Sequence, residues 1–202
     1  MKTRKISLTI TGCLGRMGQQ LIKSTNKDNR FKINSLTENK LQRKKILGIL
    51  PKLNNEEAFR KSDVIIDFTV PKCTLEVLRI ALKQKKRVVI GTTGFSLKEE
   101  NIIKKISKKI PILKAGNMSL GINLLMYLSE IASKALSSNF QSKVFEAHHK
   151  FKKDHPSGTA LMLGQGIAIG KNKNLCRIIG KKYLNKKNFP YGNKINFNSI
   201  RK

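Results

Sequence analysis

The sequence predicts an α/β fold built on a doubly wound parallel sheet, and three observations support this prediction. Short apolar runs of strand length, such as VIIDF at 64–68, alternate with helical segments of about ten residues. A glycine-punctuated turn at 12–18 follows the first of these runs. Beyond Gly121 the alternation gives way to a long helix with an apolar stripe. We therefore expect one domain at 1–119 and a second at 120–202.

The first domain is expected to alternate strands with helices throughout. The run VIIDF predicts a fully buried strand because it is continuously apolar. Ser96, followed three residues later by Glu99, predicts a capping box at the start of a helix. The expected strands are 6–10, 31–38, 64–68, 87–90 and 111–115, and the expected helices are 18–24, 55–60, 71–82 and 96–109. This order indicates βαβ units joined by right-handed crossovers.

The second domain has a different pattern. A helix is expected at 122–136, a strand at 141–147, a polar loop at 148–156 and a helix at 157–169. From Lys171 the periodicity is weak until 194–200, which alternates like a strand. The sequence ends within two residues of this alternating segment.

The formal net charge of +30 raises the question of a nucleic-acid partner. Only nine of the 42 basic residues are arginine, and Lys, Ile and Asn together make up 73 of the 202 residues. Since these three amino acids have AT-rich codons, a biased genome explains the charge without a functional role. Nucleic-acid readers favour arginine and aromatic residues, and aromatics are 6% here. The composition therefore disfavours nucleic acid as a partner.

Neither a membrane nor a metal is expected as a partner. The apolar runs are far shorter than the roughly 18 residues of a membrane span, and the basic N-terminus lacks a signal-peptide core. We therefore expect a cytoplasmic protein. Cys13, Cys73 and Cys176 are widely spaced and show no metal-ligand spacing. They are expected to be structural or incidental thiols.

A glycine-rich segment suggests a phosphate site. Gly12, Gly15 and Gly18 follow an expected strand and open an expected helix, where backbone amides bind a pyrophosphate. Glu38 lies 20 residues beyond Gly18, at the end of the second expected strand. A carboxylate there accepts hydrogen bonds from an adenosine ribose. The alternative is a structural turn with an unrelated surface acid.

A second cluster, EAHHKFKKDHPSGTA at 146–160, suits an anionic substrate. Gly158 and Thr159 are expected in the first turn of a helix, whose free amides and positive dipole favour a carboxylate. Lys152 lies near other cations, which lower a lysine pKa and make proton donation easier. The alternative is a solvated basic loop.

Five motifs together resemble one family. They are GxxGRMG at 12–18, VIIDFTxP at 64–71, VIGTTGF at 89–95, GNxSxGxN at 116–123 and EAHHxxKxDxPSGTA at 146–160. In order and approximate spacing the sequence is similar to the 4-hydroxy-tetrahydrodipicolinate reductase family, also called dihydrodipicolinate reductase. The motifs cover nearly the whole chain.

The resemblance implies a Rossmann-like dinucleotide-binding domain followed by an α+β substrate domain. It implies that NADH or NADPH reduces a small cyclic dicarboxylate, 4-hydroxy-tetrahydrodipicolinate, to tetrahydrodipicolinate in lysine biosynthesis through diaminopimelate. The implied cofactor-binding residues are Gly12, Cys13, Leu14, Gly15, Arg16, Met17, Glu38, Gly91, Thr92, Thr93, Ala115, Gly116, Asn117 and Met118. The implied catalytic pair is His148 and Lys152, with Lys152 as the proton donor, and the implied substrate binders are His149, Gly158 and Thr159. The resemblance also implies a homotetramer for a complete chain.

Several positions depart from the family pattern. Asn39 stands where some members have arginine, so no adjacent guanidinium pairs with a 2′-phosphate, which favours NADH. Phe151 and Met118 replace a frequent imidazole and a frequent phenylalanine, which is expected to alter packing more than chemistry. The family continues past Ile200, so we expect an incomplete substrate domain whose last strand is an unpaired edge. Alternative interpretations are a truncated or decaying reductase without activity, or a basic nucleic-acid-binding protein on the same fold.

Overall fold

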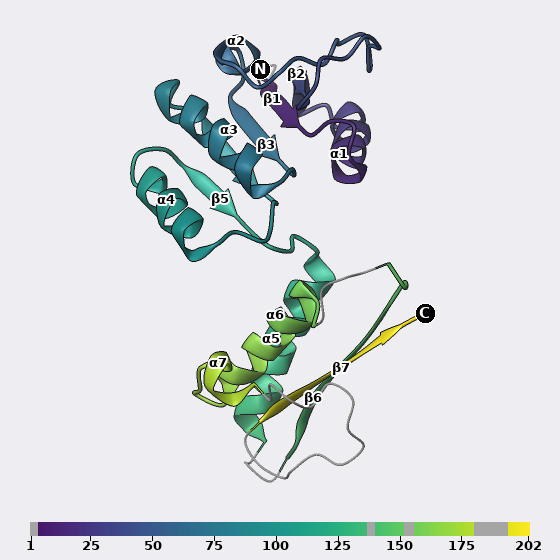
Figure 1. Cartoon of the computed structure of the whole chain (residues 1–202), viewed down its shortest axis with the longest axis vertical. Helices are drawn as coiled ribbons and strands as arrows, with labels where there is room; N and C mark the ends of the chain where they lie inside the picture. The colour runs from purple at the N-terminus through teal and green to yellow at the C-terminus, as the bar shows by residue number, and fades with distance from the viewer. Residues whose placement is uncertain (1–3, 137–139, 152–155, 180–193) are drawn as a thin grey trace. The chain divides into compact units, whose positions relative to one another are not determined.

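The computed structural model describes residues 4–136, 140–151, 156–179 and 194–202 (Figure 1). They belong to two compact units, Met1–Gly116 and Asn117–Lys202, which are described separately. Within the described ranges, no helix has the length and apolar character needed to cross a membrane.

The first unit is a five-stranded, fully parallel sheet with the strand order β2-β1-β3-β4-β5. Its elements are β1 (Ile6–Thr11), α1 (Arg16–Lys27), β2 (Phe31–Thr37), α2 (Glu56–Arg60), β3 (Val64–Asp67), α3 (Pro71–Lys83), β4 (Arg87–Ile90), α4 (Leu97–Ser107) and β5 (Ile112–Lys114). Since β2 lies on one side of β1 and β3 on the other, the winding reverses between β1 and β3. Ligands of such sheets bind beyond the carboxyl ends of the strands at this reversal. The Rossmann-like doubly wound fold is confirmed.

Local sequence signals account for the helix starts in this unit. The expected capping box is present, because Ser96 and Glu99 exchange hydrogen bonds at the N-terminus of α4. The side chain of Asn55 accepts a hydrogen bond from the Ala58 amide at 2.8 Å and so caps α2. The largest core cluster packs α2, α3 and α4 against the strands, and it contains Ala58, Phe59, Ile65, Val77, Leu78, Ala81, Val88, Ile90, Ile103, Ile106 and Ile110.

The second unit contains two helices packed together and a small parallel sheet. Its elements are α5 (Leu120–Ala135), β6 (Ser142–His148), α6 (Gly158–Gly170), α7 (Leu175–Ile178) and β7 (Ile195–Arg201). The final strand was expected to be an edge strand, and β7 is one among the described residues. In a two-stranded sheet it pairs on one side with β6, in register from Ser142–Ile195 to His148–Arg201. The pairing buries Ile195 and Phe197 in a common core with Val144.

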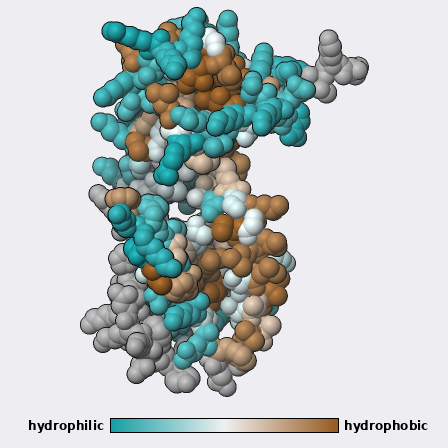
Figure 2. Space-filling view, turned by 90° about the vertical axis from the view of Figure 1, so that its right-hand side faces the viewer, coloured by the Kyte–Doolittle hydropathy of each residue, from teal (hydrophilic) through white to brown (hydrophobic). Residues whose placement is uncertain are grey.

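Small residues bring α5 and α6 close together. A Cβ at Gly166 of α6 would lie 2.6 Å from the Met126 carbonyl oxygen of α5. None of the residues of α5 is buried. Its exposed apolar side chains contribute to the brown surface of this unit (Figure 2), and they include Leu120, Leu124, Leu125, Tyr127, Leu128 and Ile131.

Candidate active site

The loop between β1 and α1 is a tight turn that requires glycine. Gly12 has φ +64°, and a Cβ on it would lie 2.7 Å from Cγ2 of Thr69. The Gly15 amide donates a hydrogen bond to the Gly12 carbonyl oxygen at 3.0 Å. Any side chain at Gly12 would be strained and obstructed, so the bare backbone of the loop approaches the residues that follow β3.

Helix α1 begins directly after this loop, and its N-terminus lacks a side-chain cap. Gly15 occupies the N-cap position without a side-chain hydrogen bond. A Cβ on Gly18 would lie 2.9 Å from the Gly12 carbonyl carbon, so the first turn sits tightly on the loop. First-turn amides have no acceptor within a helix. The amides of Arg16 and Met17 therefore have no acceptor within the helix, and they lie at its positive end, which favours an anion.

Glu38 lies against the glycine loop, although 24 residues separate it from Leu14. Its Oε1 accepts a hydrogen bond from the Leu14 amide at 3.1 Å, and its Oε2 accepts one from the Asn39 amide at 3.2 Å. β1 and β2 are adjacent parallel strands, so the residues that follow them meet at one edge of the sheet. The loop and the carboxylate therefore form one continuous surface.

A cavity of about 420 Å³ opens at this edge. It is lined by Gly12, Leu14, Gly15, Glu38, Asn39, Asn54, Phe68, Thr69, Val70 and Cys73. The last five are absent from the residues expected from the sequence. Phe68, Thr69 and Val70 directly follow β3, and a position after a buried parallel strand is a signal that identifies them.

A buried carboxyl group also joins three strand ends at this edge. Asp67, the last residue of β3, is fully buried. Its two oxygens accept hydrogen bonds from four threonine hydroxyls: Thr11 at 2.5 Å, Thr69 at 2.8 Å, Thr74 at 2.5 Å and Thr92 at 3.0 Å. Asp67 is absent from the site residues expected from the sequence, although an acid at the end of an apolar strand requires such partners when buried.

Cys13 contributes to the loop through its backbone position only. Its side chain is buried in a core cluster with Ile10, Ile22 and Leu36, and its amide donates to the Thr37 carbonyl at 3.2 Å. Burial, together with the nearby negative charge of Glu38, raises the pKa of the thiol to about 11. The thiol is therefore an unreactive structural group, as the sequence indicated.

The residues after β4 and β5 lie at the same edge of the sheet. The Gly91 amide donates to the Asp67 carbonyl oxygen at 2.8 Å, and the Ala115 amide donates to the Ile90 carbonyl at 3.1 Å. A Cβ on Gly91 would overlap the ring of Phe68. Thr93 is exposed. The structure therefore brings the GTTGF turn, Ala115, and the glycine loop to one edge of the first unit.

Asn117 and Met118 belong to the second unit, just before α5. The Asn117 Oδ1 accepts a hydrogen bond from the Ser119 amide at 2.8 Å, and its Nδ2 donates to Oγ1 of Thr159 at 3.2 Å. The side chain of Met118 is exposed. Asn117 thus connects the start of α5 with the first turn of α6.

The histidine cluster lies where β6 ends and α6 begins. His148, the last residue of β6, contacts Oε2 of Glu146 through Nε2 at 3.1 Å. Ser157 is the N-cap of α6 and accepts the Ala160 amide at 3.1 Å. Gly158 is exposed, and no atom of the described residues lies within 4 Å of a Cβ placed on it. An open N-terminus with amides at Gly158 and Thr159 favours a carboxylate.

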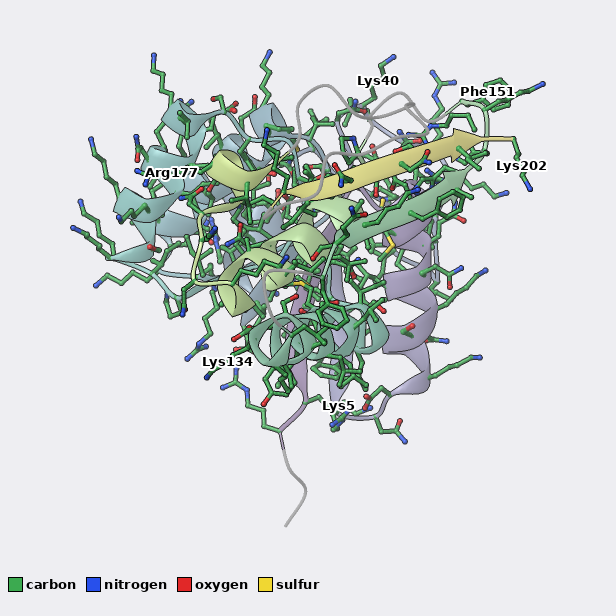
Figure 3. The ribbon with its side chains drawn as sticks, turned by 90° about the horizontal axis from the view of Figure 1, so that it is seen from below. Lys5, Lys40, Lys134, Phe151, Arg177 and Lys202 are labelled. Carbon is green, nitrogen blue, oxygen red and sulfur yellow. The ribbon has the colours of Figure 1, made fainter. Side chains whose placement is uncertain are left out.

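Backbone hydrogen bonds join the loop after β6 to the end of β7. The Lys202 amide donates to the His148 carbonyl at 3.0 Å, and the Lys150 amide donates to the Lys202 carbonyl at 2.7 Å. Phe151 is 76% exposed and projects near Lys202 (Figure 3), with its ring centroid 6.3 Å from that of His149. Lys152, the expected proton donor, lies outside the described residues.

Family-wide sequence profiles match both units of the chain. Residues 6–118 match the profile of the dihydrodipicolinate reductase N-terminus, and residues 121–202 match that of its C-terminus. The chain belongs to the dihydrodipicolinate reductase family. Its members are oxidoreductases, and the N-terminal domain of this reductase binds NAD(P)H.

Individual members of the reductase family agree with this assignment. The chain is 70% identical over 199 residues to the 4-hydroxy-tetrahydrodipicolinate reductase of Pelagibacter ubique (strain HTCC1062), covering 98% of this chain and 77% of that protein. It is 39% identical over 176 residues to the enzyme of Buchnera aphidicola subsp. Cinara cedri (strain Cc), covering 81% and 64% of the two chains. The dipicolinate-bound dihydrodipicolinate reductase of Paenisporosarcina sp. TG-14 has a TM-score of 0.69 at 25% identity, over 98% of this chain and 79% of that one.

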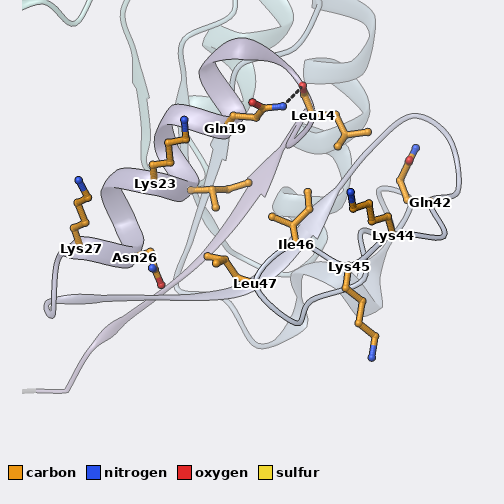
Figure 4. A pocket seen from close by; sticks show the side chains of 11 residues that line it. Leu14, Gln19, Lys23, Asn26, Lys27, Gln42, Lys44, Lys45, Ile46 and Leu47 are labelled. Carbon is orange, nitrogen blue, oxygen red and sulfur yellow. Dashed lines mark hydrogen bonds between the residues drawn. The ribbon is translucent and has the colours of Figure 1, made fainter.

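A second cavity of the reductase, of about 540 Å³, lies between α1 and the segment 42–47 (Figure 4). Its apolar lining comes from Leu14, Ile22, Ile46 and Leu47, and its polar lining from Gln19, Lys23, Asn26, Lys27, Gln42, Lys44 and Lys45. Leu14 lines both cavities. Lys44 therefore lines a cavity that reaches the glycine loop at Leu14. Among the described residues, no group of three His, Cys, Asp or Glu side chains is arranged to hold a metal ion.

Proposed function

We propose that this chain carries out the family reaction, the NAD(P)H-dependent reduction of 4-hydroxy-tetrahydrodipicolinate in lysine biosynthesis. Residues at the sheet edge of the first unit and at the N-terminus of α6 support this proposal. The observation that carries the proposal is the hydrogen bond between the Leu14 amide and Glu38. It joins a glycine loop and an acidic residue in the arrangement that a dinucleotide requires.

The first unit has the features that fit the cofactor. The uncapped start of α1 favours the pyrophosphate, and Glu38 is available to the adenosine ribose. Of the residues expected at the nicotinamide, Gly91, Thr92, Thr93, Ala115 and Gly116 belong to this unit, and Asn117 and Met118 belong to the second unit. A bound NAD(P)H supplies a hydride to the ring carbon that carries the substrate hydroxyl.

The second unit supplies the substrate-side groups. Gly158 and Thr159 present amides and a hydroxyl to a substrate carboxylate, and His149 adds a further donor. Lys152 donates the proton with which the departing hydroxyl leaves as water, while His148 assists at the same centre. One hydride and one proton are consumed for each water released, so the reaction balances. The assignment of Lys152 rests on the EAHHxxKxDxPSGTA motif.

NADH is the proposed preferred cofactor. Asn39 follows Glu38 and offers no positive charge to a 2′-phosphate, whereas a guanidinium there pairs with it. Lys44 lines the same cavity as Leu14. Its positive charge would favour the 2′-phosphate of NADPH and so oppose the preference for NADH. We also propose that a complete chain forms a homotetramer, from the family resemblance, and we propose a cytoplasmic location.

Calorimetric titration with NADH and NADPH tests the cofactor assignment. We expect NADH to bind at least as tightly as NADPH, and we expect Asn39→Arg to improve NADPH binding selectively. Lys44→Ala is the matched control, and it is expected to leave NADH binding unchanged. Tighter binding of NADPH than NADH that is lost in Lys44→Ala would reverse the proposed preference. A folded protein that binds neither nucleotide would refute the cofactor site.

Steady-state kinetics tests the proton donor. Lys152→Ala is expected to lower kcat by about 10²–10⁴-fold, with a smaller effect on KM, because proton transfer occurs in the transition state. His148→Ala is the comparison variant. Near-normal kcat in Lys152→Ala together with loss of activity in His148→Ala would assign the proton to His148 instead.

A further inference from the structure

Glu146 occupies a central position on the polar end of the small sheet. It precedes His148 by two residues on β6, so both side chains project from the same face. In the parallel register Glu146 lies opposite Ser199, and His148 lies opposite Arg201. The same face is apolar at Val144, which is buried. On this face of β6, the apolar core therefore ends at Val144 and a polar cluster begins at Glu146.

The Glu146 carboxylate has partners on three elements. Its Oε2 lies 3.1 Å from Nε2 of His148. Its Oε1 accepts the Ser157 amide at 2.9 Å and the Ser199 hydroxyl at 2.5 Å, and lies 3.9 Å from Nη2 of Arg201. The side chain is only 10% exposed. Such a cluster fixes the carboxylate in one place between β6, β7 and the start of α6.

Hydrogen bonds keep this carboxylate charged despite its burial. Burial raises its pKa, but the hydrogen bonds from Ser157, Ser199 and His148 outweigh that effect and lower the pKa to about 2. At neutral pH the group is therefore an anion that only accepts hydrogen bonds. In a neutral imidazole, an acceptor at Nε2 requires the proton on Nε2, which leaves the Nδ1 lone pair free.

We propose that Glu146 is a positioning residue of the reductase, whose carboxylate fixes the tautomer of His148 and the position of the α6 N-terminus beside it. Through Oε2 it selects the Nε2–H form of His148, and through Oε1 it holds Ser157, the N-cap residue that precedes Gly158 and Thr159. One carboxylate thus aligns a catalytic imidazole with the amides that face the substrate carboxylate. The inference rests on the proposed roles of His148 and Thr159.

Glu146→Gln removes the negative charge and keeps the size and shape of the side chain. The amide oxygen still accepts the Ser157 amide, so the NH₂ group faces His148 and donates to an unprotonated Nε2, which favours the Nδ1–H tautomer. Glu130→Gln on α5 is the matched control, since it makes the same charge change outside the cluster. Ser199→Ala removes one donor and keeps the carboxylate, so it is expected to retain the wild-type tautomer.

Nitrogen-15 NMR of histidine side chains, at a pH where the ring is neutral, reads the tautomer directly. His148→Gln identifies the resonance. We expect the Nε2–H form in the wild type, in Glu130→Gln and in Ser199→Ala, and a mixture or the Nδ1–H form in Glu146→Gln. An Nδ1–H wild-type ring would overturn the proposal, whether or not the variant folds. An unchanged tautomer in folded Glu146→Gln would also overturn it.

Kinetics distinguishes this inference from the proposed function. We expect Glu146→Gln to lower kcat by about 10²-fold, and Glu130→Gln to leave kcat unchanged. Glu146→Asp keeps the charge and is expected to recover part of the lost kcat. If the wild type turns over and Glu146→Gln matches it in both kcat and tautomer, the positioning role fails while the reductase function stands. If the wild type has no turnover, the NMR result alone decides the positioning role.

Discussion

Asn117 donates a hydrogen bond from Nδ2 to Oγ1 of Thr159 at 3.2 Å, joining the residue before α5 to the first turn of α6. The two residues are 42 positions apart in the chain. Asn117 belongs to the segment proposed for the nicotinamide, and Thr159 to the pair proposed for the substrate carboxylate. Within the second unit, the bond therefore connects a residue proposed for the cofactor with one proposed for the substrate.

Replacement of Thr159 tests the substrate side of this connection. Thr159→Val removes the hydroxyl and keeps the shape of the side chain. Since a carboxylate is bound in both the ground and transition states, we expect KM to rise with little change in kcat. The loss is limited to about 1.5–3 kcal/mol, the value of a hydrogen bond to a charged group. A large fall in kcat at unchanged KM would place Thr159 in the chemical step.

Replacement of Gly18 tests the close packing of the glycine loop. Gly18→Ala places a Cβ against the Gly12 backbone, so we expect a loss of about 1–3 kcal/mol in the free energy of unfolding and weaker NADH binding. Gly121→Ala is the control, because the nearest atom to its Cβ is 3.9 Å away. Urea unfolding and calorimetry measure the two effects. If both variants have the same free energy of unfolding, the loop backbone shifts to accommodate a Cβ at Gly18 without loss of stability.

Replacement of Asp67 tests the threonine cluster at the strand ends. Asp67→Asn leaves a group that cannot accept from all four hydroxyls, so we expect unfolding to become easier by about 2 kcal/mol and NADH to bind more weakly. Glu100→Gln serves as control, since its pair with Lys114 is partly exposed and worth about 0–1 kcal/mol. If Asp67→Asn lowers the free energy of unfolding no more than the control does, the threonine cluster does not stabilise the fold.

The pKa of Glu146 predicts how stability depends on pH. The folded protein lowers this pKa from 4.5 to about 2, so the unfolded chain binds the proton more tightly. The carboxylate therefore adds stability above pH 4.5, and this contribution disappears as the pH falls from 4.5 toward 2.

Urea unfolding of the wild type and Glu146→Gln across this range isolates the effect from that of other acids. The stability difference between the two proteins is expected to shrink as the pH falls. A difference that stays constant down to the lowest pH would contradict the assignment of this pKa.

The sequence predicted the first unit well because its signals are local. The apolar run at 64–68 and the Ser96–Glu99 capping box specify a strand and a helix start without help from distant residues. The glycine pattern and Glu38 also predicted neighbours in space, since adjacent parallel strands end at one edge of the sheet. The hydrogen bond between Leu14 and Glu38 shows this proximity.

The second unit was harder to predict because its contacts join residues that are far apart in the sequence. The pairing of β7 with β6 joins residues more than 50 positions apart, and nothing local indicates it. The short helix α7 spans four residues and is capped by Asn174, whose side chain accepts the Cys176 amide. The cluster around Glu146 escaped prediction for the same reason, since Ser199 and Ser157 reach it from separate elements.

The activity proposed for this chain is the reduction of 4-hydroxy-tetrahydrodipicolinate with a nicotinamide cofactor. The most direct test follows the loss of NADH absorbance with the purified chain and substrate generated in situ, while the product is identified by mass. We predict one NADH oxidised for each tetrahydrodipicolinate formed, with activity strongly reduced in Lys152→Ala. Folded protein that binds NADH but gives no substrate-dependent oxidation would contradict the claim for this chain.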